Sequence, residues 1–207
     1  NRAIDFAMLL TMPAAAALVV IADPIVTVLF QRGAFDTGDA AATGAALAAF
    51  AVGLPAYVLI KALAPGFFAR EDTATPVKVA AVALVVNVGL ALALMPTLAH
   101  VGIALATAVS SWFNAALLAA LLYRRGLLDP DRRLMTRLGR TLASALIMAA
   151  GLWLLAGALA ASLSASDPAG IAALAILVIA GMVVFGVCAQ LLRAMSLGEM
   201  CAMLRRN

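Results

Sequence analysis

The feature that most constrains this chain is the alternation of long apolar stretches with short charged connections. A helix needs about 20 apolar residues to cross a bilayer. Six stretches are long enough: 6–30, 39–68, 76–98, 101–123, 138–163 and 169–192. Each is a continuous apolar run without the period-two alternation of a barrel strand, so the spans are expected to be helices. The sequence therefore predicts an all-α integral membrane protein with six transmembrane helices.

The cations of the connections predict how these spans are oriented. If both termini lie on one side of the membrane, that side holds twelve of the 14 Lys and Arg residues. The other side holds only Arg32, and the remaining cation, Lys61, lies within a span. Because positively charged connections stay in the cytoplasm, both termini are predicted to be cytoplasmic. The twelve cations are Arg2, Arg70, Lys78, Arg124, Arg125, Arg132, Arg133, Arg137, Arg140, Arg193, Arg205 and Arg206.

Composition excludes several classes of protein. The chain is 66% hydrophobic and 12% charged, far from the values of about 45–50% and about 25% of soluble domains. Its basic residues sit at the ends of the spans, where they meet anionic lipid headgroups, so the charge does not indicate a nucleic-acid partner. The sequence contains no Ser/His/Asp set, phosphate-binding glycine loop or clustered metal ligands, and its only histidine, His100, is predicted to be a surface residue. We therefore predict no enzyme activity, no cofactor and no metal.

The chain is predicted to divide into four parts. Residues 1–123 form four transmembrane helices, and residues 124–140 form a basic cytoplasmic loop. Residues 141–193 form the final two helices, and residues 194–207 a cytoplasmic tail at the membrane interface. The chain begins at Asn1 rather than Met and enters a span almost at once. We therefore expect it to be the C-terminal part of a longer, transporter-like protein.

Lys61 is the most informative polar residue within a span, because a charge in the membrane is costly unless it faces protein or water. It lies about seven residues, or roughly 10 Å, from the cytoplasmic end of its predicted helix. One interpretation is a cation in a central cavity that meets an anionic substrate. The other is that its long stem reaches the inner interface, which this depth permits.

A polar stripe follows one face of the fourth span. Thr107, Ser110, Ser111 and Asn114 are spaced i, i+3, i+4 and i+7, so they share a helical face. Such a stripe could line a cavity, or it could make hydrogen bonds between closely packed helices. Asn87, in the third span, could join either arrangement. Pro13 and Pro55 are expected to bend their helices.

Three segments of the sequence resemble a known family. They are LFQRGAF at 29–35, GLP at 53–55 and, most specifically, KALAPGFFAREDTATPVK at 61–78. The last segment closely resembles the pattern KVLAPGFYARxDTxTPVK of the MurJ (or MviN) lipid II flippases of the MOP exporter superfamily. NAALL at 114–118 and the basic loop after it continue the resemblance over essentially the whole chain.

The resemblance implies a fold and a function. Family members have fourteen helices with both ends cytoplasmic, and this chain is similar to helices nine to fourteen. The family moves undecaprenyl-diphosphate-linked peptidoglycan precursor across the bacterial inner membrane by alternating access. The expected partners are this lipid-linked precursor, membrane lipids and an N-terminal lobe that this chain lacks. The last two helices would form a hydrophobic groove for the lipid tail, although their apolar character also suits anchoring.

The resemblance also implies that a sodium site could be present. Two other functions remain open. Some members bind sodium between the third and fourth spans seen here, and Asn87 and Thr107 match two ligand positions. The acidic ligand expected one turn after Asn87 is Ala91, so only a degenerate ion site is expected. The alternatives are a cation-coupled small-molecule exporter of the same superfamily, which would favour carboxylates deep in the spans, and a non-transporting membrane scaffold.

Overall fold

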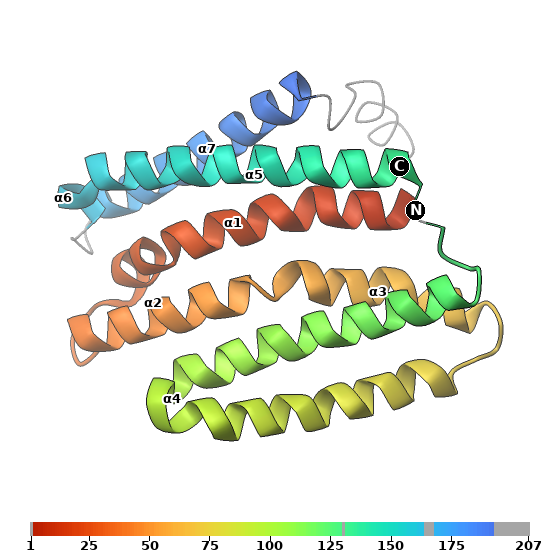
Figure 1. The fold of residues 1–207 in the computed structure, drawn as a ribbon. Helices are drawn as coiled ribbons and strands as arrows, with labels where there is room; N and C mark the ends of the chain where they lie inside the picture. The colour runs from red at the N-terminus through yellow and green to blue at the C-terminus, as the bar shows by residue number, and fades with distance from the viewer. Residues whose placement is uncertain (1, 130, 164–167, 193–207) are drawn as a thin grey trace.

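The computed structural model describes residues 2–129, 131–163 and 168–192, and every regular element in these ranges is a helix. The predicted interfacial tail at 194–207 lies outside the described residues. The elements are α1 (Arg2–Phe30), α2 (Thr37–Ala51), α3 (Leu54–Phe68), α4 (Ala74–Arg124), α5 (Arg132–Ala158), α6 (Ala160–Leu163) and α7 (Pro168–Leu191). Figure 1 shows a bundle in which α4 forms one edge and α5 and α7 form the other.

Helix α1 occupies the centre of the bundle. It packs against α2, α3, α5 and α7, whereas α4 packs on α2 and α3, and α5 packs on α7. One apolar cluster joins Ile4 and Met8 to Phe67, Leu118 and Leu134, and a second cluster farther along α1 is built around Ile21, Val28, Met148, Leu152 and Leu177. The first helix therefore connects the four-helix part to the final pair.

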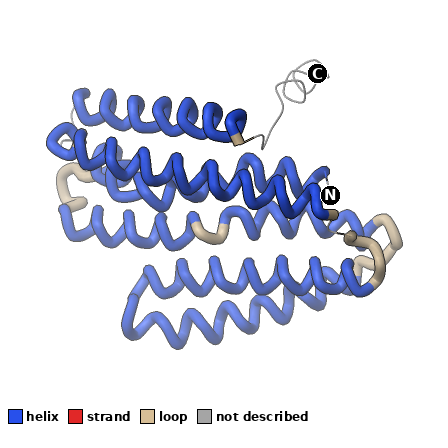
Figure 2. Tube along the Cα trace, turned by 45° about the horizontal axis from the view of Figure 1, so that its top comes forward, coloured by secondary structure: helices blue, strands red, loops and turns tan. Residues whose placement is uncertain are grey.

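The second predicted span is broken in its middle. Helices α2 and α3 together form one apolar stretch of 32 residues, Thr37–Phe68, and Val52 and Gly53 separate them as a turn (Figure 2). Pro55 lies in the first turn of α3, where its missing N–H costs no helical hydrogen bond. The structure therefore interrupts the helix at Val52 and Gly53, whose backbone angles both stay in the right-handed helical region, and the bend expected at Pro55 stays a prediction.

Helix α4 contains two predicted spans that fold back on each other, as Figure 1 shows. The reversal occurs at Ala99, whose φ of 47° and ψ of −128° are not helical. A Cβ on Gly102 would lie 2.7 Å from the carbonyl oxygen of Leu94, so the reversal requires a glycine there. Five stretches of the described chain are long and apolar enough to cross a membrane, and one of them, the 51-residue α4, contains both arms of this reversal. The six-pass count and the cytoplasmic termini stay predictions.

The basic segment at 124–140 is only partly a loop. Helix α5 begins at Arg132, and the side chain of Asp131 caps it by accepting a hydrogen bond from the backbone N–H of Leu134 at 2.8 Å. The arginines at 132–140 therefore lie on the first turns of a helix whose later turns are apolar. The Arg137 guanidinium donates to Asp5 of α1 at 2.8 Å, which joins the starts of the two helices.

Candidate functional site

The break between α2 and α3 faces the second arm of α4 at close range. The indole Nε1 of Trp112 donates a hydrogen bond to the carbonyl oxygen of Val52 at 2.9 Å. A Cβ on Gly53 would lie 3.0 Å from the Cα of Ala108, so the backbone of the break approaches α4 almost to contact. Broken helices leave backbone groups unpaired at membrane depth, and transporters place binding sites at such positions. This juxtaposition is the candidate site.

The predicted polar stripe lies on this second arm of α4, where its hydroxyls bond within their own helix. Thr107 donates to the carbonyl oxygen of Ile103 at 2.8 Å, while Ser110 and Ser111 donate to the carbonyl oxygen of Thr107 at 3.1 and 2.6 Å. Ser110 and Ser111 are buried. Both serines therefore satisfy their hydrogen-bonding needs locally, and neither uses its donor to bridge to a neighbouring helix.

Asn114 completes the stripe and differs from the hydroxyl residues. Its Oδ1 is buried and accepts no hydrogen bond from the described residues. An unsatisfied buried amide oxygen is costly, so this atom has the capacity to accept a hydrogen bond from a group outside the described residues. It lies two residues after Trp112 and thus near the level of the break.

Asn87 meets Thr107 across the α4 hairpin. The Nδ2 of Asn87 donates to the Oγ1 of Thr107 at 3.4 Å, so the two residues predicted as ion ligands contact each other directly. Ala91 offers no side-chain oxygen, and no group of three or more His, Cys, Asp or Glu residues suited to a metal occurs in the described part of the chain. The side chains at 87, 91 and 107 thus supply no carboxylate for a cation, and the degenerate ion site stays a prediction.

Lys61 lies on α3 with an exposed side chain, seven residues before the end of that helix at Phe68. The exposed residues Pro65 and Phe68 share its face, while Leu63 and Phe67 on the opposite side are buried in the bundle. Lys61 makes no ion pair with the described residues. The structure does not bring Lys61 into contact with the polar stripe. Lys61 lies on the exposed face of α3.

A polar cluster between α3 and α4 was not anticipated from the sequence. Asp72 accepts hydrogen bonds from the backbone N–H of Thr75 at 2.9 Å, from the Thr75 hydroxyl at 2.6 Å and from the Arg125 guanidinium at 2.6 Å. Arg125 also stacks 5.3 Å from the ring centre of the buried Phe67. The bonds from Thr75 and then Arg125 hold the pKa of Asp72 well below its ordinary value. The signal available in the sequence was the capping spacing of Asp72 and Thr75.

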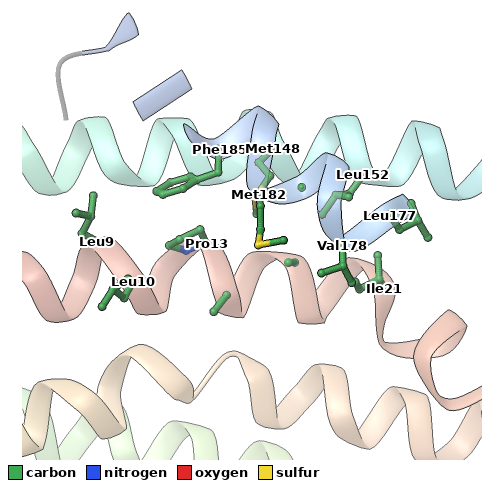
Figure 3. A pocket seen from close by; sticks show the side chains of 13 residues that line it. Leu9, Leu10, Pro13, Ile21, Met148, Leu152, Leu177, Val178, Met182 and Phe185 are labelled. Atoms are coloured by element: carbon green, nitrogen blue, oxygen red, sulfur yellow. The ribbon is translucent and has the colours of Figure 1, made fainter. Parts of the chain in front are cut away.

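An apolar groove of about 270 Å³ opens between α1, α5 and α7 (Figure 3). All thirteen residues that line it are apolar or glycine, and they include Leu9 and Pro13 of α1, Met148 of α5, and Met182 and Phe185 of α7. The sequence predicted a groove formed by the last two helices. The structure shows that α1 supplies a third wall.

Comparisons with known proteins agree with this architecture. The family described as "Lipid II flippase MurJ" matches residues 1–167. The chain therefore belongs to the lipid II flippase MurJ family. Relatives include the probable lipid II flippase MurJ of Rhizobium meliloti, 48% identical over 187 residues, and that of Rhizobium tropici, 49% identical over 148 residues. These alignments cover 89% and 72% of this chain.

The family resemblance read from the sequence is thus confirmed, and so is the all-helical membrane fold. A solved structure of a lipid II flippase MurJ in an inward closed conformation matches 92% of this chain with a TM-score of 0.75 at 21% identity. The chain spans 35% and 28% of the two Rhizobium relatives and 38% of that solved chain. It therefore corresponds to about a third of a MurJ protein.

Proposed function

We propose that this chain forms the C-terminal part of a flippase that moves undecaprenyl-diphosphate-linked peptidoglycan precursor across the bacterial inner membrane by alternating access. The observation that carries the proposal is the apolar groove between α1, α5 and α7, in a chain that belongs to the MurJ family. The protein acts as a transporter rather than an enzyme. Its partners are the lipid-linked precursor, the surrounding lipids and the N-terminal lobe that would complete the protein.

The groove suits the hydrocarbon tail of such a substrate. A polyprenyl chain has no polar groups, so it gains only from apolar contact and shape, and the groove offers residues such as Leu9, Leu10 and Val178 with no charged group in its wall. Met182 adds a flexible side chain that can adapt to the tail, and Phe185 adds a flat aromatic surface. The tail can therefore stay on the membrane side of the bundle while the headgroup crosses elsewhere.

The headgroup path is proposed along the polar side of the four-helix part. Lys61 would attract the diphosphate as a point charge. The stripe of Thr107, Ser110, Ser111 and Asn114, opposite the break at Val52, would offer hydrogen-bonding groups to the sugar and peptide. Of these groups, Asn114 Oδ1 is buried and has no hydrogen-bond partner among the described residues.

The role of the groove in transport can be tested with a substitution that fills it. In the full-length protein, Ala14→Phe places a ring in the groove from α1, whereas Ala175→Phe adds the same ring to an exposed position of α7 outside it. In cells depleted of their own flippase, Ala14→Phe is expected to reduce export of the lipid-linked precursor at least tenfold, while Ala175→Phe sustains it. Full export by an Ala14→Phe protein present at normal levels would exclude the groove from the transport path.

A further inference from the structure

Helix α2 buries no large side chain of its own. Its larger apolar residues, Leu47 and Phe50, are half-buried and exposed, respectively. The buried residues of α2 are all small: Ala40, Gly44, Ala49 and Ala51. Neither of the two apolar clusters of the bundle includes a residue of α2, whereas α3 contributes Leu63 and Phe67 to the first cluster. Because side chains that interlock in a core resist the movement of a helix, α3 is anchored more firmly than α2.

The second span contacts its neighbours through backbone that lies close to backbone. A Cβ on Gly44 of α2 would lie 3.1 Å from the Cα of Asp23 on α1. A Cβ on Gly53, at the break, would lie 3.0 Å from the Cα of Ala108 on α4. A glycine has no side chain that interlocks with the neighbouring helix. Helices that meet in this way can slide by small amounts without repacking a core.

Two side chains of α4 bond to the backbone of α2 and of the break. The Nε2 of His100 donates to the carbonyl oxygen of Ala42 at 3.0 Å, and the Nε1 of Trp112 donates to the carbonyl oxygen of Val52 at 2.9 Å. Ala42 and Val52 are about 15 Å apart along a helix, so the two bonds hold α2 at separate levels. One such bond shifts an equilibrium by about two- to tenfold, which makes its loss reversible.

The joint between α2 and α3 permits a change of angle. Val52 has φ −58° and ψ −29°, and Gly53 has φ −80° and ψ −18°. Pro55 has no N–H to donate to the carbonyl oxygen of Ala51, so the helical hydrogen-bond ladder is incomplete at the break. Small changes in the torsions of Val52 and Gly53 therefore reorient α2, and Gly53 has no Cβ to restrict them.

We infer that α2 moves as a unit about Val52 and Gly53, and that the bonds from His100 and Trp112 retain it in the position that the structure shows. Helix α3 stays in the first apolar cluster during this movement. The break faces the arm of α4 that carries the polar stripe, so the movement changes the access to that stripe. The inference concerns the motion of the chain alone and holds whichever substrate the protein moves.

Spin labels test this movement in the full-length protein in nanodiscs. In a background whose native cysteines are replaced by serine, labels at Ala41→Cys of α2 and Val109→Cys of α4 report the distance between these two helices by double electron–electron resonance. Labels at Phe68→Cys of α3 and Ala120→Cys of α4 form the reference pair. All four positions are exposed, so the labels disturb no buried contact.

The decisive variant is His100→Ala/Trp112→Phe, which removes both donors. The share of molecules with a second Ala41–Val109 distance is expected to rise by about fivefold or more, while the reference distance stays the same. The matched control is Trp153→Phe, which removes an exposed indole of α5 and should leave both distances as in the wild type.

Three outcomes would overturn the inference. An unchanged distance between α2 and α4 in His100→Ala/Trp112→Phe would mean that the two bonds retain nothing. An equal change in the reference pair would mean that the whole bundle loosens. A loss of helix measured by circular dichroism would mean that α2 unfolds rather than moves. Since the measurement needs no substrate, its failure would leave the proposed function standing.

Discussion

The indole of Trp112 holds the carbonyl oxygen of Val52 at 2.9 Å, across 60 residues of sequence. Val52 lies in the break between α2 and α3, where a carbonyl oxygen has no helical partner. In a membrane, an unpaired carbonyl cannot be satisfied by water. The Trp112 indole therefore supplies a hydrogen-bond partner for the interrupted span and joins the break to the arm of α4 that carries the polar stripe.

Trp112→Phe tests this role, because it keeps the ring but removes the donor. The loss of one hydrogen bond to a carbonyl in an apolar setting is expected to lower the free energy of unfolding by about 1 kcal/mol and the melting temperature by about 2–4 °C. Thermal unfolding in detergent, followed by circular dichroism, measures the change. The chain's other tryptophan, Trp153, is 69% exposed on α5, so Trp153→Phe is the matched control. Equal melting temperatures for both variants would contradict the role given to Trp112.

Gly102→Ala tests the reversal of α4. The added Cβ would lie 2.7 and 2.8 Å from the carbonyl oxygen and carbon of Leu94, which are backbone atoms that no rotamer change can move away. We expect a loss of about 3 kcal/mol and a sharp fall in the yield of folded protein. Gly89→Ala, on the first arm of the same helix, meets nothing within 4 Å and is expected to be neutral or stabilising. Normal folding of Gly102→Ala would mean that the hairpin turn can open.

Much of the fold was predictable because it depends on local properties of the sequence. Long apolar runs predicted the helices, Pro55 lies beside the break, and Ala99 reverses α4 in the gap between the predicted spans 76–98 and 101–123. The motif at 61–78 pointed to the family that the comparisons show. Each of these signals lies within a short window of residues.

The contacts between helices were not predictable, because small and apolar residues pack on almost any neighbour without a distinguishing pattern. Nothing in the sequence placed α1 at the centre or made Leu9 and Pro13 a wall of the groove. Nothing in the sequence indicated that Trp112 would bond to the backbone of Val52. Similarly, Ser110 and Ser111 share a face with Thr107, but only the structure shows that their hydroxyls donate to a carbonyl oxygen of their own helix. The roles given to Lys61 and Asn114 stay predictions.

The stability of the folded protein is expected to depend on pH through Asp72, in a direction that follows from the contacts of its carboxylate. Its folded pKa is lowered by Thr75 and Arg125, so its contribution to stability is fully present above its unfolded pKa of about 4 and is lost as pH falls toward the lower folded value. The melting temperature of Asp72→Asn should therefore lie below that of the wild type between pH 5 and 8, and the gap should narrow below about pH 4. Glu71→Gln, at an exposed neighbour, is the control. A constant gap at every pH would show that the charge of Asp72 is not what matters.

Lys61→Ala separates the transport role of this residue from a purely structural one. Lys61 is exposed and makes no ion pair with the described residues, so its removal should leave the melting temperature of the full-length protein nearly unchanged. If its charge meets the diphosphate, export of the lipid-linked precursor in flippase-depleted cells should fall by about tenfold or more, and Lys61→Arg should restore most of it. Lys78→Ala, which removes a lysine from the first turns of α4, is the matched control and should export normally. Unchanged export with Lys61→Ala would mean that the ammonium group only reaches the interface, and the cationic step would then belong to the N-terminal lobe.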